Sequence, residues 1–385
     1  MESVSTVKPD EPPSPELRVA FIGGGSGGHL FPAIAAGHSL LSLQRGTKLL
    51  FLCSSRPVDT QVLATAKWSA DIASSVPYVR MAARRGFLYQ LALLPEWIQG
   101  YRSARKMLLS FRPQVAVGVG ASASIPGMLA ARQLNIPLVL MEQNTIPGKA
   151  TQFLARWAEL TLAGMPFDSQ AAKSWPTELK VTGTPVRSEI SRLRAAPRES
   201  SGRSRLLILG GSQGSASVNR LVLEALADEH CVPSDWQIIH QTGESQVKQV
   251  AAEYARRGRT ATVLSFLPNL PELLATATVV VSRGGAGTLQ ELACAGTPAI
   301  LIPFSHAASN HQIANAQRLA SSGAAALVEE TSDDAGLQLR QLLNSLVSSP
   351  QIRETYRHGI GQFAAPEAAD VSARLICKIA GFGAT

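Results

Sequence analysis

Residues 17–43 read LRVAFIGGGSGGHLFPAIAAGHSLLSL, and this stretch divides into three parts. Residues 17–22 are an apolar run, residues 23–28 are almost all glycine, and apolar residues recur with a helical period over residues 30–43. A strand, a glycine loop and a helix in this order are typical of the opening of a Rossmann unit. Pro32 falls in the first turn of the expected helix, where proline is tolerated.

A second opening of the same kind begins at residue 205, where RLLIL is followed by GGSQG and by a helical pattern over residues 217–227. Further strands are predicted after each opening: at 48–53, 115–119, 137–141 and 159–163, and then at 237–241, 262–264, 279–282 and 299–302. Strands that alternate with helical patterns indicate parallel sheets with helices on both faces. The predicted fold class is therefore α/β, with two Rossmann-like domains that face each other across a cleft.

The 385 residues are enough for two domains, and a polar stretch over residues 185–203 separates the two openings. We predict a disordered tail over residues 1–16, a first domain over 17–186 and a second over 187–360. The last segment, residues 361–385, is expected to form a helix that packs back on the first domain.

Composition and charge limit the function. Hydrophobic residues make up 45% and charged residues 17% of the chain, which is typical of a globular protein. The net charge of +8 favours an anionic partner, and because no nucleic-acid-binding motif is present, phosphate-bearing substrates and an anionic membrane remain. The four cysteines form no CxxC pair and the histidines no ligand cluster, so we expect a reducing compartment and no metal.

The segment over residues 80–106 mixes basic and apolar residues. Its basic residues are Arg80, Arg84, Arg85, Arg102, Arg105 and Lys106. This pattern suits an interfacial patch on anionic lipid, although an ordinary amphipathic helix with solvated charges would show it too. No apolar run is long enough to span a bilayer, and the N-terminus does not resemble a signal peptide. We therefore expect a protein that stays in the compartment where it is made.

The glycine loop over residues 23–29 ends in His29. The free N–H groups of the following helix start suit an anion, and a histidine there can act as a general base near neutral pH. A tight turn between a strand and a helix would use the same glycines. No Gly-Lys-Ser/Thr follows, so the loop is not a P-loop.

Two further motifs follow strands of the second domain. The sequence SRGGAGTLQE, residues 282–291, could hold a diphosphate with its backbone N–H groups and Thr288, and Glu291 could accept the hydroxyls of a ribose. Residues 303–315 place Gln312 where it could bind a sugar hydroxyl. A plain helix start and a capped loop are the simpler alternatives for these two motifs. The chain has no Asp-x-Asp, so helix starts and Arg187 would have to stabilise the charge of a leaving nucleotide without a metal.

Together these motifs resemble the MurG family, which transfers N-acetylglucosamine from UDP-N-acetylglucosamine (UDP-GlcNAc) to undecaprenyl-diphospho-muramoyl-pentapeptide. The resemblance runs from about Arg18 to Phe382 and is carried by GGGSGGH with FPAIA, MEQNTIPGKA, VTGTPVR, LGGSQGS, SRGGAGTLQELACAG, PFSHAASNHQIANA and APEAAD. It implies a GT-B fold with the donor in the C-terminal domain and the acceptor in the N-terminal one. It also implies a role in peptidoglycan synthesis, and so in cell shape and division, at the cytoplasmic face of the bacterial inner membrane.

The resemblance implies a set of substrate-binding residues. These are Ser26, Gly27 and Gly28 beside the donor sugar and the acceptor diphosphate, Asn144 at the donor sugar, Arg187 and Ser212 at UDP, Leu267 at the uracil through its backbone, Ala286, Gly287, Thr288, Leu289, Gln290 and Glu291 at the diphosphate and ribose, and Gln312 at the sugar. We predict an inverting reaction without metal or cofactor, in which His29 is the general base and Glu142 the second candidate.

The chain departs from the family pattern in one loop. The family usually has Gly-Gly-aromatic after the strand that begins at Val115, where this chain reads GVGASAS over residues 118–124. Ser26 also stands where Thr is more usual. The first departure concerns the loop thought to contact the acceptor diphosphate, so the resemblance is weakest at the acceptor site.

Four other functions share parts of this pattern. A glycosyltransferase for another lipid acceptor, a UDP-sugar epimerase and a non-catalytic sugar-nucleotide binder would each use similar glycine loops, and the first and third stay open as alternatives. A nicotinamide dehydrogenase would need an acidic residue at the end of the second strand. CSS, residues 53–55, stands there instead.

Overall fold

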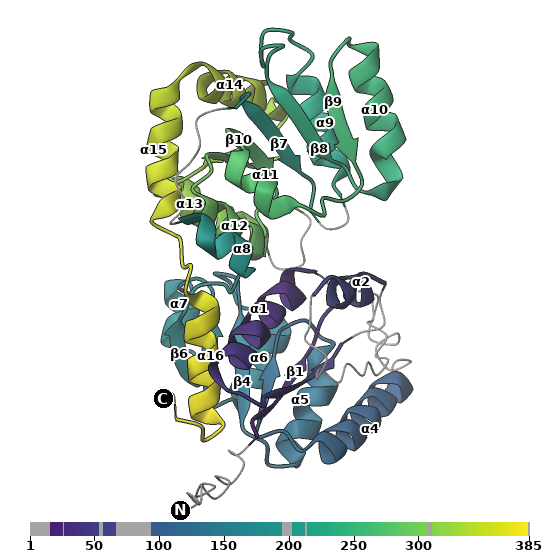
Figure 1. Ribbon diagram of the computed structural model, residues 1–385, viewed down its shortest axis with the longest axis vertical. Helices are drawn as coiled ribbons and strands as arrows, with labels where there is room; N and C mark the ends of the chain where they lie inside the picture. The colour runs from purple at the N-terminus through teal and green to yellow at the C-terminus, as the bar shows by residue number, and fades with distance from the viewer. Residues whose placement is uncertain are drawn as a thin grey trace, which may run out of the picture.

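The computed structural model describes residues 16–25, 27–53, 57–66, 94–194, 202–211, 214–305 and 310–383. Two lobes lie end to end, and each contains a six-stranded parallel sheet with helices packed against it (Figure 1). The predicted α/β fold class, with two Rossmann-like lobes, is thus confirmed.

The sheet of the first lobe has the strand order β2-β1-β3-β4-β5-β6. Its strands are β1 (Arg18–Ile22), β2 (Lys48–Leu52), β3 (Val115–Gly118), β4 (Leu138–Glu142), β5 (Leu160–Ala163) and β6 (Glu178–Val181). Its helices are α1 (Gly27–Leu43), α2 (Pro57–Thr65), α4 (Leu94–Phe111), α5 (Ser124–Gln133), α6 (Lys149–Ala155) and α7 (Ser169–Lys173). The central strands are buried on both faces, which explains why they read as continuous apolar runs.

The sheet of the second lobe has the order β12-β11-β10-β7-β8-β9. Its strands are β7 (Arg205–Leu209), β8 (Gln237–Gln241), β9 (Ala261–Leu264), β10 (Val279–Ser282), β11 (Ala299–Leu301) and β12 (Ala326–Leu327). Its helices are α8 (Ser188–Ser191), α9 (Ala216–Ala225), α10 (Val247–Arg256), α11 (Leu270–Thr276), α12 (Ala286–Ala295), α13 (His311–Ser321), α14 (Ala335–Ser348) and α15 (Pro350–Gly361).

Each sheet has one point where the strand order reverses, and there the connections of two neighbouring strands leave in opposite directions. In the first lobe this point lies between β1 and β3, and in the second between β7 and β10. Ligands of open α/β sheets bind at the carboxyl ends of such strands. Glycine-containing loops follow all four strands, so the topology gathers the glycine motifs at these two places.

The chain returns to the first lobe at its C-terminal end. Helix α16 (Ala368–Ile379) packs along α1 (Figure 1). Ser39 of α1 donates a hydrogen bond of 2.7 Å to Asp370 of α16. The return passes close to Gly183, which has φ +82°, and a Cβ atom there would lie 2.2 Å from the Cβ of Ala365. Gly183 is therefore required both by its backbone conformation and by the close approach of the returning chain.

The structure differs from the sequence predictions at several boundaries. Helix α1 begins at Gly27, so Gly28 and His29 lie inside its first turn and not in the loop. Strands β6 and β12 were not predicted, since β6 is largely exposed and β12 has only two residues. Glu16, predicted to belong to the disordered tail, is instead paired with Arg18 and Lys48, while the rest of that prediction lies outside the described residues.

Candidate active site

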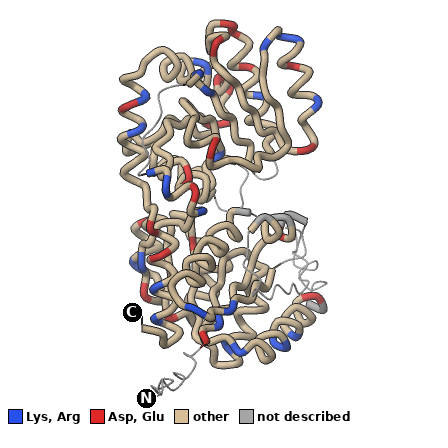
Figure 2. The backbone as a smooth tube through the Cα atoms, in the orientation of Figure 1, with Lys and Arg blue, Asp and Glu red and all other residues tan. Residues whose placement is uncertain are grey.

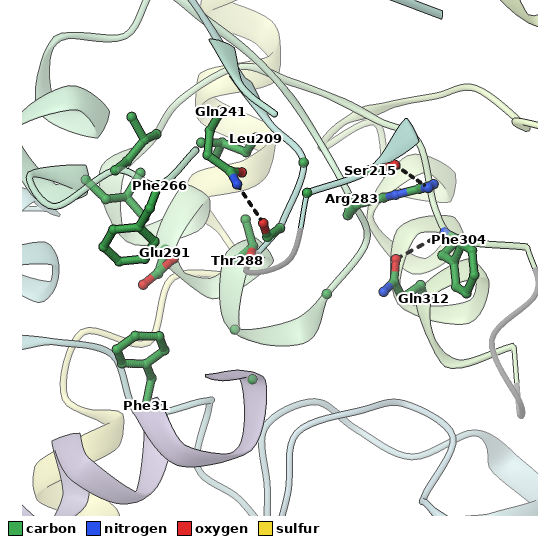
Figure 3. A pocket seen from close by; sticks show the side chains of 18 of the residues that line it. Phe31, Leu209, Ser215, Gln241, Phe266, Arg283, Thr288, Glu291, Phe304 and Gln312 are labelled. Atoms are coloured by element: carbon green, nitrogen blue, oxygen red, sulfur yellow. Dashed lines mark hydrogen bonds between the residues drawn. The ribbon is translucent and has the colours of Figure 1, made fainter. Parts of the chain in front are cut away.

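A cleft of about 1000 Å³ lies between the two lobes, which is ample for a nucleotide sugar. Its walls come from the start of α1, the connection between the lobes and the strand ends of the second sheet (Figure 3). Seven residues predicted for the site line it: Gly28, Arg187, Leu267, Gly287, Thr288, Glu291 and Gln312. The predicted site residues Ser26 and Ser212 lie outside the described residues.

The glycine loop after β1 is held by a buried carboxylate. Gly23, Gly24 and Gly25 all have positive φ, which other residues rarely adopt. The backbone N–H of Gly25 donates to both oxygens of Asp59, at 3.0 and 2.7 Å, and a Cβ on Gly24 would lie 2.6 Å from Asp59 Oδ2. Asp59 thus fixes the loop that leads into α1, and only glycine fits beside it.

Helix α12 starts at the cleft without a side-chain cap in the described structure. Gly285 occupies the N-cap position, and a Cβ on the preceding Gly284 would lie 2.5 Å from the carbonyl oxygen of Gln312. The small residues therefore let the turn lie against α13, while the N–H groups of the first helical turn stay available. Such a helix start suits the diphosphate of a nucleotide.

Arg187 and Glu291 form an ion pair at the cleft, with 3.1 Å between Arg187 Nη2 and Glu291 Oε1. The Arg187 guanidinium also lies 5.2 Å from the centre of the Phe31 ring, which belongs to α1 of the first lobe. Figure 3 shows Phe31 facing Glu291 and Phe266 from the opposite side. Burial raises the pKa of Glu291 above its usual value, and the Arg187 charge opposes this effect. The residues predicted for the phosphates and the ribose are thus adjacent.

A second ion pair, which is more deeply buried, connects the chain after three strands of the second lobe, β7, β10 and β12. Arg283 lies 2.6 Å from Glu330, with the two side chains 10% and 6% exposed, and it donates to Ser215 and Ser217 at 2.5 and 2.6 Å. Burial alone would raise the pKa of Glu330. Hydrogen bonds from Ser217, from Ser305 and from Arg283 outweigh it and lower the pKa to about 2. The pair is therefore ionised throughout the physiological range.

His29 does not line the cleft but lies directly beside it, on the first turn of α1. Its Nδ1 atom is buried and has no hydrogen-bond partner among the described residues. A Cβ atom on Gly120 would lie 2.9 Å from this nitrogen, so the loop after β3 closes over the ring. Burial lowers the pKa of His29, while the Glu142 carboxylate and the Val119 backbone act in the opposite direction. A neutral imidazole is the form that can accept a proton.

The Glu142 carboxylate is fully engaged in its own loop. Its Oε1 accepts from the backbone and side chain of Asn144, at 3.1 and 2.8 Å, and its Oε2 accepts from Gly148 and Thr151, at 2.9 and 2.7 Å. With a residue exposure of 3%, this carboxylate organises the loop after β4. A role in proton transfer would require it to give up one of these bonds.

Asn144 joins the lobes. Its Oδ1 accepts a 3.0 Å hydrogen bond from the buried Asn315 of α13, whose Oδ1 in turn accepts from the Thr145 backbone at 3.0 Å. The His311 ring lies 2.7 Å from the carbonyl oxygen of Ile146. The loop predicted to contact the donor sugar is therefore attached to the helix that carries Gln312.

Ala286, Leu289 and Gln290 are the predicted residues of α12 that do not line the cleft. Leu289 and Gln290 are 1% and 4% exposed, and Gln290 donates to the carbonyl oxygen of Phe363 at 3.2 Å. Ala286 is also buried, so these three residues can meet a ligand only through the backbone. Gln312 lines the cleft, and its Oε1 accepts from the Phe304 backbone at 3.1 Å.

Family models match most of the chain. The glycosyltransferase family 28 N-terminal domain matches residues 19–162, and the glycosyltransferase family 28 C-terminal domain matches residues 205–371. The chain is 33% identical over 338 residues to the UDP-N-acetylglucosamine--N-acetylmuramyl-(pentapeptide) pyrophosphoryl-undecaprenol N-acetylglucosamine transferase of Geobacter metallireducens, covering 87% of this chain and 91% of that protein. The chain belongs to the MurG family of glycosyltransferases.

Other MurG proteins are similar over the same length. The transferase of the same name from Sorangium cellulosum is 33% identical over 365 residues, covering 92% of this chain and 86% of that protein. The crystal structure of Acinetobacter baumannii MurG matches with a TM-score of 0.71 and 26% identity, covering 94% of this chain and 99% of that one. The predicted MurG resemblance is thus confirmed.

The loop after β3 is where the sequence departs from the expected MurG pattern. Ala121 has φ 60°, a left-handed conformation that favours glycine, and it lies directly after Gly120 at φ 94°. Ser124 donates a 2.7 Å hydrogen bond to the carbonyl oxygen of Ala121 and so supports the turn. The loop keeps a glycine-like backbone although it lacks the second glycine.

Five residues at or beside the cleft were not predicted as site residues. Phe31 and Arg283 lie within the quoted MurG motifs, while Asp59, Gln241 and Glu330 lie outside them. Gln241 and Glu330 stand at or just after the carboxyl end of a strand, which is the position where site residues of α/β proteins gather. The rule that site residues follow strand ends could therefore have predicted Gln241 and Glu330 from the sequence. Asp59 carries no such signal, since its partner loop is 34 residues away.

We expect Arg283→Met to lower the free energy of unfolding by about 3–5 kcal/mol, because it leaves the Glu330 carboxylate buried and unpaired. Urea unfolding at pH 7, followed by circular dichroism, measures the loss. Arg220→Met is the matched control, since the Arg220–Glu224 pair is solvent-exposed and should contribute less than about 1 kcal/mol. Equal losses in the two variants would contradict a structural role for the buried pair.

Proposed function

We propose that this chain transfers N-acetylglucosamine from UDP-GlcNAc to undecaprenyl-diphospho-N-acetylmuramoyl-pentapeptide, the lipid-linked precursor of peptidoglycan. A hydroxyl oxygen of the acceptor sugar forms a bond to the anomeric carbon of the donor. The bond from that carbon to the UDP oxygen breaks, UDP leaves with the electron pair, and the hydroxyl proton passes to a base. Attack from the face opposite UDP inverts the anomeric configuration.

The observation that carries the proposal is the cleft between the lobes, where Gly28 of α1 and the start of α12 line the same cavity. The starts of α1 and α12 lie in one cavity with Arg187 and Glu291, and this combination suits a nucleoside diphosphate sugar. The names of the MurG relatives identify that sugar and the acceptor. The glycine loops of the first lobe would take the acceptor diphosphate.

The leaving UDP gains negative charge as its bond to the sugar breaks. The N–H groups of Gly287 and Thr288 and the Arg187 guanidinium would stabilise that charge, which is the role of a preorganised electrostatic site. We propose that this arrangement replaces a metal ion. His29 is the proposed base, because a neutral imidazole beside the cleft, with its pKa lowered, can accept the hydroxyl proton.

We propose that the enzyme works on an anionic membrane surface, with α4 as part of the contact. Figure 2 shows basic residues along this helix, and Arg102, Arg105 and Lys106 are exposed beside the exposed apolar side chains of Ile98 and Leu109. Ala104 and Leu108 of the same helix are buried in the core. The part of the predicted patch over residues 80–93 lies outside the described residues. No described helix is both long and apolar enough to cross a membrane.

The proposal is tested by incubating the purified protein with labelled UDP-GlcNAc and a lipid-diphospho-muramoyl-pentapeptide acceptor. We expect label in the lipid product with inverted configuration, one UDP released per transfer, and the same rate in the presence of a chelator. Binding of UDP-GlcNAc without transfer to this acceptor would favour a non-catalytic binder or another lipid acceptor. Loss of turnover on chelation would contradict the metal-free mechanism.

His29→Gln should lower kcat by roughly 10²- to 10⁴-fold, the usual share of general base catalysis. Because burial lowers the pKa of His29 below its ordinary 6.5, the base is neutral above that pH and kcat should fall only at lower pH. The variant should lose this acid limb. A pH profile of kcat at saturating substrates measures both effects.

His38→Gln, on the same helix, serves as the matched control and should leave kcat within about twofold, as expected for a residue outside the reaction. Normal turnover in the His29 variant, or an acid limb that persists in it, would mean that another group accepts the proton.

Replacing Arg102, Arg105 and Lys106 by Glu should weaken sedimentation with vesicles that contain anionic phospholipid, by roughly tenfold or more at low salt. The control replaces Arg220, Lys248 and Arg256, which are exposed on the second lobe, with the same change of charge. Binding that is independent of salt and of anionic lipid, or that falls equally in both variants, would contradict an electrostatic contact through α4.

A further inference from the structure

Gln241 ends β8, the strand between β7 and β9, and lines the cleft with a residue exposure of 5%. Its Nε2 donates one hydrogen bond to the carbonyl oxygen of Gly211 and one to that of Ser265, each 2.9 Å long. Gly211 follows β7 and Ser265 follows β9. A single side chain therefore holds together the loops that leave both neighbouring strands.

These two loops form one end of the cleft. Leu209 and Gly211 line one wall, and Phe266 and Leu267 line the other. Figure 3 shows Leu209, Gln241 and Phe266 grouped at this end, away from Gln312. A nucleobase is flat and has apolar ring faces, so it fits between these two walls, while the start of α12 and Arg187 suit the phosphates.

The two hydrogen bonds of Gln241 are well placed to fix the distance between the two walls at this end of the cleft. An amide nitrogen has two N–H groups, and both are used on backbone carbonyls, so the side chain has no other donor to offer a ligand. Main-chain bonds support the same junction, since Gly210 N donates to Gln241 O at 3.2 Å and Thr242 N donates to Leu264 O at 2.9 Å. No sugar or phosphate contact needs to be assumed for the side chain.

We infer that Gln241 is a positioning residue for the nucleotide donor: it sets the separation of the two walls that hold the nucleobase. The inference rests on the proposed function for the identity of the ligand. Gln241 acts through Gly211 and Ser265 and does not touch the reacting atoms, so its loss should weaken donor binding more than it slows the chemical step.

The test uses Gln241→Met, which keeps the length of the side chain and removes both N–H groups, and Gln241→Glu, which turns an acceptor towards the two carbonyls. Calorimetry with UDP should give a Kd raised roughly tenfold for the Met variant and more for the Glu variant, because the carbonyl oxygens of Gly211 and Ser265 are left without a donor. Uridine monophosphate should lose the same factor as UDP, since the affected end holds the base. The kcat at saturating donor should stay within about threefold while KM rises.

Gln237→Met is the matched control, because Gln237 lies at the other end of β8, where its Oε1 accepts from Arg205 at 2.9 Å. It should leave the Kd unchanged. Hydrogen exchange should quicken around Gly211 and Ser265 in the Gln241 variants alone, with thermal midpoints showing that all variants are folded.

Variants at Gln241 that bind UDP as the wild type does, or that lose affinity for UDP but not for uridine monophosphate, would overturn the inference. So would an equal loss in the Gln237 control. Wild-type protein that binds no UDP would instead contradict the proposed function, and the named ligand with it.

Discussion

A backbone N–H group can approach a phosphate only where no side chain stands in the way, and the glycine loops at the cleft meet that constraint. The loop after β1 uses three successive glycines at positive φ, and the start of α12 uses Gly284 and Gly285. Parallel strands end at the same edge of a sheet, so each lobe can present two such loops at its reversal point. The buried strands behind them provide the rigid support.

Polar contacts join the two lobes at the cleft. Arg187 connects the Glu291 carboxylate with the ring of Phe31, and Asn144 is hydrogen-bonded to Asn315. Water can replace the partners of polar groups when they separate, so contacts of this kind cost less to reopen than an apolar core. The residues that bind the substrates in the proposed reaction are therefore also residues that hold the lobes together.

Both arginines among the described residues that line the cleft are already paired with carboxylates, Arg187 with Glu291 and Arg283 with Glu330. The net positive charge of the chain is thus not concentrated as free guanidinium groups at this site. The first turns of α1 and α12 contain no acidic residue, so their N–H groups add positive potential beside these pairs. A donor diphosphate would gain most from these N–H groups, with Arg187 shared between it and Glu291.

Periodicity and glycine placement by themselves determined the α/β class, the two openings and the strands of both sheet interiors, because a strand buried on both faces must be continuously apolar. The glycine motif after β10 predicted Thr288 and Glu291, and the MurG resemblance implied Gly28 and Arg187; all four line the cleft. Only the tertiary structure decided that Asp59 fixes the first loop, that Asn144 joins the lobes and that Gln241 spans two loops. Those roles depend on contacts between segments far apart in the chain, and hydrophobic pattern carries no record of which polar side chain will meet which distant carbonyl.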